Sequence, residues 1–512
     1  MTVFLCGNGS AISGPSFENR VPELGLSQQY TGGWEHFVGG GVASFDCDGD
    51  LFPELLLAGG ASPATLLRNV TTQRGAAVGF VAETADDLAL TQVIGAYPLD
   101  VDSDGILDLF ILRVGENRLL KGGADCSFSN FPDFGFKGGQ KWTTAFSATW
   151  EGENKLPTLA VGNYVDRDDP QGPFQTCDEN YLFRPYAGQY EQITLSPGLC
   201  PLSMLFSDWG RQGRQDLRIS NDRHYYVNDG GEQLWAMENA PRPYGKNDGW
   251  DAISIWGMGI ASRDISGDGV PEIFLTNMAD QKLQLLDIAS GGPRFQDVEF
   301  DRGTTAHRPY TGDDTNASTG WHVAFGDIDN DGLDDVFIAK GNVEDMPGSA
   351  MKDPNNLLIQ SADGTFVENG LEAGVASMER SRGAAMVDMN LDGRLDLVVV
   401  NRNAMVEIYQ NTTPSKDNWL LVDIRQDGVN TNAVGGWIEI SDGSKTWHRE
   451  ITVGGGHASG NAALIHFGLG TSRYLKIRMI RPGGMVSPWA DVSSNKIVEI
   501  NFSGDELIVS GL

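Results

Sequence analysis

The chain has 512 residues, of which 69 are acidic and 37 basic, so its formal net charge at pH 7 is −32. This excess of carboxylates argues against a surface for nucleic acid or for an anionic membrane, because both need clustered Lys and Arg. It favours cations as partners. The 65 glycines and 22 prolines, beside a hydrophobic content of 40%, predict a folded chain of short strands and many turns.

No stretch approaches the roughly 20 apolar residues of a membrane helix, which predicts no membrane insertion. The first residues, MTVFLCGNGSAISG, lack the basic and apolar regions of a signal peptide, so no export signal is visible. The five cysteines include no CxxC pair that would indicate a zinc site. Cys177 and Cys200 flank one segment, and the sequence leaves open whether they form a disulfide.

An acidic loop between two apolar strands recurs along the chain. The strings FDCDGDLFPELLL, LDVDSDGILDLFIL, RDISGDGVPEIFLT, GDIDNDGLDDVFIA and VDMNLDGRLDLVVV begin their loops at Asp46, Asp100, Asp264, Asp327 and Asp388. Two weaker copies fill the long gap after the second loop and place Trp150 and Asp208 at the first loop position. The sequence therefore predicts seven repeats.

Repeats of 50 to 63 residues with several short strands each predict an all-β fold, a seven-bladed integrin-like β-propeller over residues 34–411. A ring of blades is sealed where its chain ends meet. The sixth repeat ends in FVENGLEAGV, the seventh stops at Asn411 without such an element, and FENRVPELGL near the N-terminus is a near copy of it. We therefore expect residues 1–33 to close the last blade.

The pattern changes after a polar linker that ends at Asp417. Short apolar or alternating segments follow, among them NWLLVDI, GGWIEIS, KTWHREITV, AALIHFGLG, YLKIRMI and NKIVEINF, separated by Gly, Asp and Ser turns. They predict a separate small β domain over residues 418–512, without the acidic loop.

Oxygen-bearing side chains occupy positions 1, 3, 5 and 9 of the five intact loops, and four of these loops have Gly at position 6 for a sharp turn. Calcium takes hard oxygen ligands in such numbers, so we predict four or five calcium ions. The predicted ligands are Asp46, Asp48, Asp50, Glu54, Asp100, Asp102, Asp104, Asp108, Asp264, Ser266, Asp268, Glu272, Asp327, Asp329, Asp331, Asp335, Asp388, Asn390, Asp392 and Asp396.

The loops are not EF-hands, because position 12 holds an apolar strand residue in all five instead of the required Glu. They carry 18 carboxylates, which would repel one another without a cation. Solvated Asp/Gly turns are the alternative interpretation, and five turns in register disfavour it. In the fourth repeat, Arg211 and Arg214 adjoin Asp208 and Asp216, so we expect no metal there or in the third repeat. Leu51 replaces glycine in the first loop.

These residues resemble a known family. The loops look like the FG-GAP or VCBS repeats of integrin-type propellers, and NWLLVDI, AVGGWIEI, VGGGHASG and HFGLG resemble the ASPIC/UnbV domain. The pairing is similar to the cartilage acidic protein family, and it implies an exported, calcium-binding propeller. The chain departs from the pattern in its third and fourth repeats and in GGGHASG, which replaces a commoner Gly-Gly-Ser-Tyr type of motif.

Catalytic motifs such as HExxH, GxSxG and the P-loop do not occur in the sequence. Propellers also assemble sites at one end of the central channel, where residues just before the acidic loops converge. The pocket candidates are Glu35, His36, Trp256, Trp321, His322, Arg380 and Arg382. The alternative is that the aromatic rings and His pack between blades while the arginines neutralise carboxylates.

Two main functions follow from the sequence. The first is a calcium-stabilised extracellular or periplasmic propeller that binds a protein or glycan ligand, with calcium structural and the small domain as a recognition module. The second is an enzyme, a hydrolase or lyase, with His36 or His322 as general base and Arg382 holding an anionic substrate. A purely structural matrix protein is a third possibility.

Overall fold

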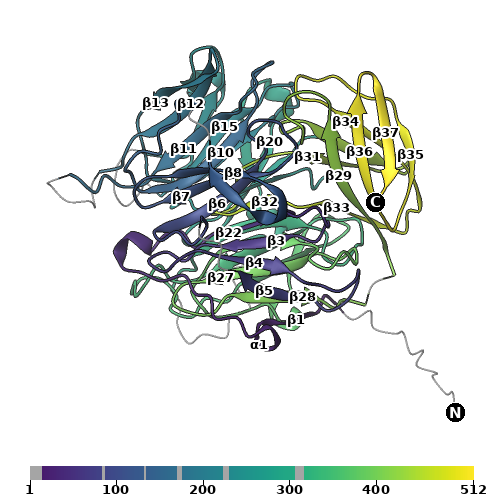
Figure 1. Cartoon of the computed structure of the whole chain (residues 1–512), viewed down its shortest axis with the longest axis horizontal. Coiled ribbons are helices and arrows are strands. Elements are labelled where there is room, and N and C mark those ends of the chain that lie inside the picture. The colour runs from purple at the N-terminus through teal and green to yellow at the C-terminus, as the bar shows by residue number, and fades with distance from the viewer. Residues whose placement is uncertain are drawn as a thin grey trace.

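The computed structural model describes residues 14–83, 87–131, 134–169, 176–222, 230–305, 316–414 and 416–512. Cys6 and the first part of the N-terminal segment lie outside these residues. The structure is built almost entirely of β-strands (Figure 1). Among the described residues, its short helical turns are α1 (Val21–Leu24), α2 (Glu299–Arg302), α3 (Gly370–Ala373), η1 (Trp34–His36), η2 (Ala124–Cys126), η4 (Lys246–Asp248) and η5 (Ile288–Ser290).

Residues up to Asn411 form four-stranded antiparallel sheets, seven within the described residues. From the inner to the outer strand, the first three are β2 (Val42–Phe45), β3 (Glu54–Leu57), β4 (Thr65–Asn69), β5 (Phe80–Glu83); β6 (Val93–Leu99), β7 (Asp108–Arg113), β8 (Arg118–Gly122), β9 (Phe128–Asn130); and β10 (Thr143–Thr149), β11 (Thr158–Asn163), β12 (Asn180–Tyr186), β13 (Gln189–Leu195).

The next four sheets are β14 (Pro201–Ser207), β15 (Asp216–Asn221), β16 (Gln233–Ala236), β17 (Arg242–Pro243); β18 (Ile260–Arg263), β19 (Glu272–Leu275), β20 (Lys282–Leu286), β21 (Phe295–Asp297); β22 (Gly320–Gly326), β23 (Asp335–Lys340), β24 (Asn356–Gln360), β25 (Phe366–Glu368); and β26 (Ser381–Val387), β27 (Asp396–Asn401), β28 (Glu407–Asn411), β1 (Phe17–Asn19). The inner strands contact one another in chain order, and β26 contacts β2. The sheets therefore form a closed ring, a β-propeller.

The N-terminal segment supplies the outer strand of the last sheet. In β1, Phe17 pairs with Asn411 and Asn19 with Tyr409, both in β28. A short helix follows β1, as α2 follows β21 and α3 follows β25. The element missing after the seventh repeat is thus provided by the segment that copies it in sequence.

The C-terminal residues form two further sheets, ordered β33 (Ile465–Gly470), β29 (Asn418–Gln426), β36 (Lys496–Ser503), β37 (Glu506–Gly511), and β31 (Thr446–Glu450), β30 (Trp437–Ser441), β34 (Tyr474–Ile480), β35 (Ala490–Ser493). Alternate residues of these strands are buried, which explains the period-two pattern of the sequence. The core between the sheets is continuous with the apolar cluster of the second and third propeller sheets.

One segment of this domain leaves its sheets and enters the propeller. We call residues 453–462 the channel loop; it ends in β32 (Gly460–Ala462), which pairs in parallel with β2. Figure 1 shows β32 among the propeller strands, apart from β34 to β37. The expected small domain is therefore not separate, because one of its strands belongs to the first propeller sheet.

The channel loop bonds to the inner strands around the axis. Val453 bridges to Ala148, Gly454 to Leu205, Gly456 to Ile260 and Ser459 to Ala96, one strand from each of four sheets. The innermost strand of a blade has an unpaired edge that faces the axis, and these bonds satisfy part of that edge. The loop thus ties the propeller together from its centre.

The close approach of the channel loop predicts the effect of a small substitution. A Cβ atom on Gly95 would lie 1.9 Å from the carbonyl oxygen of Ala458. We expect Gly95→Ala to lower the free energy of unfolding by about 1–3 kcal/mol, because backbone must move to admit the methyl group. Urea unfolding measures this loss, and limited proteolysis near the linker reports whether the C-terminal domain loosens.

Gly348→Ala is the matched control, since nothing lies within 4 Å of a Cβ atom at that position. Equal stability of the two variants would contradict the packing described for the channel loop.

Candidate functional site

Each acidic loop joins the first and second strands of a propeller sheet. The loop residue at position 9 is the first residue of the second strand, as Asp335 is in β23 and Asp396 in β27. The seven loops therefore lie on one face of the propeller, which we call the acidic-loop face. Successive strands run in opposite directions, so the connections after the second and fourth strands lie on the opposite face.

Backbone N–H groups orient the carboxylates of positions 1 and 9. In the sixth loop, the Gly332 N–H donates to Asp327 at 2.7 Å, and the N–H groups of Ile328 and Gln360 each donate to Asp335 at 2.9 Å. The bond from position 6 to position 1 recurs in all five intact loops and in the fourth repeat. These two positions therefore shape the turn as well as offering oxygen ligands.

Carboxylate oxygens converge in three of the loops. Within each group, oxygens lie within 4.8 Å of one another: Asp46, Asp48 and Asp50; Asp100, Asp102 and Asp108; and Asp327, Asp329 and Asp335. The second and sixth loops are more deeply buried than the first. Asp327 and Asp335 are each 1% exposed, and Asp327 Oδ1 has no hydrogen-bond partner among the described residues.

Burial raises the pKa of several loop carboxyls at positions 1 and 9. The pKa of Asp327 and of Asp335 lies well above the ordinary range, first because of burial and then because neighbouring aspartates repel a second negative charge. Burial likewise raises the pKa of Glu54, Asp108 and Glu272 to about 7. A cation among these oxygens would remove the cause of the shift, so the donor set fits a hard divalent ion.

The other two intact loops differ in their neighbours. Asp264 Oδ2 lies 2.7 Å from Nδ1 of His448, which belongs to the C-terminal domain. In the seventh loop, Arg394 forms an ion pair with Asp392. Protein groups therefore lie against a predicted ligand in each of these loops.

Basic side chains also reach the first and second loops. Arg68 pairs with Asp48 at 2.7 Å, and Lys121 pairs with Asp102 at 2.7 Å and with Asp104 at 2.6 Å. A calcium ion in either loop would compete with these cations for the same oxygens.

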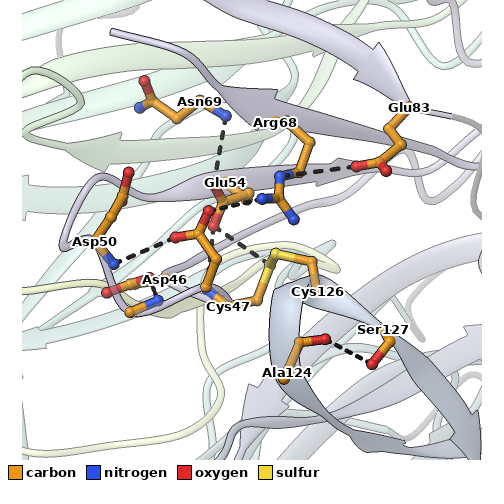
Figure 2. Close-up of a disulfide and its surroundings, with 12 residues drawn as sticks. Asp46, Cys47, Asp50, Glu54, Arg68, Asn69, Glu83, Ala124, Cys126 and Ser127 are labelled. Atoms are coloured by element: carbon orange, nitrogen blue, oxygen red, sulfur yellow. Dashed lines mark hydrogen bonds and ion pairs between the residues drawn. A yellow bond between two sulfur atoms is a disulfide. The ribbon is translucent and has the colours of Figure 1, made fainter. Parts of the chain in front are cut away.

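A disulfide joins the first loop to the second sheet (Figure 2). Cys47, at loop position 2, is bonded to Cys126, which lies 79 residues away in η2. The Cys47 N–H donates to Glu54 at 3.1 Å. In each of the other intact loops, the N–H at position 2 likewise donates to the carboxylate at position 9. The sequence analysis missed this pair, because nothing in the spacing of the two cysteines connects them. The second disulfide is Cys177–Cys200, which the sequence left open.

The fourth repeat satisfies its carboxylates with protein groups. Arg214 donates to Asp216 at 3.0 Å, as expected, and Trp209 Nε1 and the Tyr244 hydroxyl also donate to Asp216. Arg211 is placed differently: it pairs with Glu439 of the C-terminal domain at 2.6 Å.

The C-terminal domain covers the acidic-loop face. The side chains of Trp447 and Lys445 both donate to the Gly332 carbonyl, and the Gly470 N–H donates to the Asn330 carbonyl at 2.8 Å. Thr431 donates to Asp100 of the second loop. This face is therefore an interface between the two domains.

Three of the predicted pocket residues do converge, around the channel loop. The Arg382 guanidinium lies 4.1 Å from the Trp321 ring centre, the Trp321 ring lies 5.1 Å from that of His457, and the His457 N–H donates to His322 Nδ1 at 3.0 Å. Arg382 is 0% exposed and donates to backbone carbonyls, among them those of Phe37 and Val343. Their polar groups are thus engaged by the chain itself.

The remaining pocket candidates lie elsewhere or are buried. His36 is 4% exposed and packs in the T-shaped arrangement against Tyr30. Glu35 pairs with Arg167 at 2.5 Å, and Arg380 with Asp345 at 2.7 Å. Trp256 donates its N–H to Asn277 at 2.9 Å. Burial lowers the pKa of His322 to about 4, so its imidazole is neutral at pH 7 and shielded from solvent.

A family model described as ASPIC and UnbV matches residues 426–506. These are the residues of the second domain and of the channel loop. The C-terminal domain is an ASPIC/UnbV domain.

Most of the chain is similar to cartilage acidic protein 1. The Xenopus tropicalis protein is 24% identical over 506 residues, which covers 91% of this chain and 74% of that protein. The Mus musculus protein is 25% identical over 257 residues, or 49% of this chain. The matches span 38% of the mouse protein and 22% of the Homo sapiens protein, so they cover well under half of these two relatives.

Solved structures with a similar arrangement include YCF48 from Cyanidioschyzon merolae, with a TM-score of 0.41 and 10% identity over 77% of this chain and 98% of that one. A lectin from Agrocybe aegerita that recognises non-reducing terminal N-acetylglucosamine has a TM-score of 0.38 and 14% identity, over 70% of this chain and 88% of the lectin. The propeller assignment itself rests on the strand pairing. Among the described residues, the structure contains no helix long and apolar enough to cross a membrane.

The domain interface contains a carboxyl group whose titration is testable. Burial raises the pKa of Glu450 to about 8, and its oxygens accept from the Ser207 hydroxyl and the Asp208 N–H, both at 2.6 Å. The unfolded carboxyl ionises near 4.5. The folded state therefore binds the extra proton between about pH 4.5 and 8, and this group lowers stability as the pH rises through that window.

We expect Glu450→Gln to flatten the pH dependence, because the amide keeps the shape and an acceptor without a charge. Melting temperatures of wild type and variant across pH 4.5–9 measure this, with exposed Glu191→Gln as control. If the gap between wild type and Glu450→Gln is the same at every pH, the carboxyl is not held protonated at the interface.

Proposed function

We propose that this protein is an exported, calcium-binding β-propeller that binds a protein or glycan ligand, and that its calcium ions are structural. The observation that carries the calcium proposal is the burial of uncompensated carboxylates in the sixth loop. Its Asp327 and Asp335 carboxylates are buried beside Asp329, and neither forms an ion pair with Lys or Arg among the described residues. A buried carboxylate is costly unless a cation or donor compensates it, and calcium accepts this oxygen set.

In the remaining predicted loops, a calcium ion would compete with a basic side chain for the ligand oxygens. Asp46, Asp100, Asp264 and Asp388 begin loops of the same backbone shape, but in each loop a basic side chain forms an ion pair with a predicted ligand. In the sixth loop, Lys445 donates to the Gly332 carbonyl instead. We therefore expect the sixth loop to bind calcium most tightly.

Calcium in these loops would stabilise the domain interface. The carbonyl of Gly332, in the sixth loop, accepts hydrogen bonds from Trp447 and Lys445 of the ASPIC/UnbV domain. An ion that fixes this turn also fixes the carbonyl. We propose that calcium acts as a structural ion, with no part in a reaction.

The two disulfides support export. Disulfides persist in oxidising compartments and are rare in the cytosol. Both pairs close within the propeller, at Cys47–Cys126 and Cys177–Cys200. They favour an extracellular or periplasmic location, where calcium affinities of about 10⁻⁴–10⁻³ M are usual for calcium-binding modules.

The ligand surface is proposed on the face opposite the acidic loops, since the ASPIC/UnbV domain covers the acidic-loop face. That opposite face carries the longer connections and several charged side chains, including Glu35, Arg167, Glu344 and Arg380. A ligand with hydrogen-bonding or charged groups, such as a glycan or a protein loop, suits such a polar surface.

Calcium binding is tested by a thermal melt of chelator-treated protein titrated with calcium and, in parallel, with magnesium. We expect a calcium-selective rise, worth about 2.7 kcal/mol for each site when free calcium is a hundredfold above its dissociation constant. Asp327→Asn keeps an acceptor for the Gly332 N–H but removes the charge, so it is expected to lose one bound ion by elemental analysis and part of the rise.

Asp208→Asn is the matched control, because Asp208 has the same bond to the N–H at position 6 in a repeat without predicted metal. A calcium response that is absent, or that Asp208→Asn reduces as much as Asp327→Asn does, would falsify the proposed sites.

The ligand face is tested with the labelled protein on an immobilised glycan array and on panels of extracellular proteins. We expect Arg380→Ala to weaken the interaction found by about tenfold, since a charged contact at an interface contributes on that order. Lys496→Ala, on the ASPIC/UnbV domain, serves as the control. Binding that depends on Lys496 and not on Arg380 would place the ligand on the ASPIC/UnbV domain and contradict the proposed ligand face.

A further inference from the structure

A cavity of about 310 Å³ lies where the propeller axis meets the ASPIC/UnbV domain. Its walls come from inner propeller strands, from β29 and from the channel loop, so both domains are needed to form it. It shares His322 with the pocket expected at the channel mouth, but Trp256, Trp321, Arg380 and Arg382 do not line it.

Arg263 is the unusual residue of this cavity. It is the last residue before an acidic loop, and the corresponding residues of the other six repeats are uncharged: Phe45, Leu99, Thr149, Ser207, Gly326 and Val387. The repeat architecture therefore does not require a cation there. The charge must be explained by what surrounds it in this one repeat.

The protein offers the Arg263 guanidinium little compensation. Its Nη2 donates to the Phe325 carbonyl at 3.4 Å, and its Nε is buried without a hydrogen-bond partner. No Asp or Glu oxygen forms an ion pair with it in the described part of the chain. Ser262, which lines the same cavity, also has a buried hydroxyl without a partner.

The other charged groups of the cavity already have partners. Arg449 pairs with Asp334 at 3.0 Å. The Glu450 carboxyl is bonded to Ser207 and Asp208, and Asp423 pairs with Arg425 at 3.2 Å. Asp100 accepts from Thr431 and from the Gly105 N–H.

The two histidines of the cavity wall add no charge. Burial lowers the pKa of His322 and of His466 to about 4, so both rings are neutral at pH 7. Arg263 is thus the one cation of the described wall that forms no ion pair, although the more distant carboxylates of Asp264 and Asp334 also attract it.

We propose that this cavity binds a small oxyanion, a carboxylate or a tetrahedral ion of the sulfate class, through Arg263. A guanidinium presents a planar fork of N–H donors that matches two oxygens of such an anion. Arg263 is partly buried, and its Nε is buried without a hydrogen-bond partner. A bound anion would accept from that N–H and form an ion pair with the guanidinium. The volume suits a small ion with a few waters or a short organic acid, and excludes a polymer.

The site is tested with calcium held constant, because Asp100 of the cavity wall and Asp264, which follows Arg263, are predicted calcium ligands. Wild type and Arg263→Met are melted with increasing sulfate or succinate, and chloride keeps the ionic strength equal. We expect the melting temperature of wild type to rise by about 2 °C when the anion exceeds its dissociation constant tenfold, and that of Arg263→Met to stay constant. The sulfate and succinate arms distinguish a tetrahedral ion from a carboxylate.

Arg473→Met, which removes an exposed arginine of the ASPIC/UnbV domain, is the control and is expected to respond as wild type does. Arg263→Lys keeps the charge without the fork and is expected to reduce the response, which covers the case in which Arg263→Met does not fold. Crystals of wild type soaked in selenate provide a direct measurement, with an anomalous peak expected beside Arg263. The same response in wild type and both Arg263 variants, or a cavity that contains only water after the soak, would overturn the proposal.

Discussion

The pairing of the channel loop with the inner strands is the interaction on which the rest of the structure depends. Each propeller sheet leaves the edge of its inner strand facing the axis, where N–H and C=O groups need partners. Residues 453–462 supply partners to strands from several sheets, and β32 continues the first sheet directly. The ASPIC/UnbV domain therefore completes part of the backbone hydrogen bonding of the propeller.

This constraint also decides which surfaces of the propeller are open. The channel loop fills the axis with backbone and with His457, which is 0% exposed. Trp321, His322 and Arg382 pack around that loop, so the polar cluster expected at the channel mouth serves to hold the two domains together. The same docking places the ASPIC/UnbV domain over the acidic loops, on the side of the propeller away from the opposite face.

The acidic loops show how a repeat can lose ligands without losing its shape. Position 1 accepts the N–H of position 6 in the fourth repeat as it does in the sixth, at 2.7 Å in both. The backbone turn therefore survives there, while Arg214, Trp209 and Tyr244 donate to Asp216. Carboxylates at these positions have two roles, to shape the turn and to offer oxygen, and the first does not require an ion.

The sequence by itself determined the β class, the phase of the repeats and the segment that completes the last sheet, because these depend on local patterns. The first strand of each sheet ends one residue before loop position 1, the second begins at position 9, and FENRVPELGL repeats the outer-strand motif of the sixth sheet. Sequence analysis also found the convergence of Trp321, His322 and Arg382, since equivalent positions in neighbouring blades must lie close together.

Only the tertiary structure decided the position of the glycine-rich GGGHASG segment, the Cys47–Cys126 pair and the isolation of Arg263 in a cavity. Each depends on contacts between residues far apart in the chain, for which no periodic pattern exists. The physical reason is that burial and hydrogen bonding at the axis depend on how the two domains dock, and local sequence patterns carry no record of that docking.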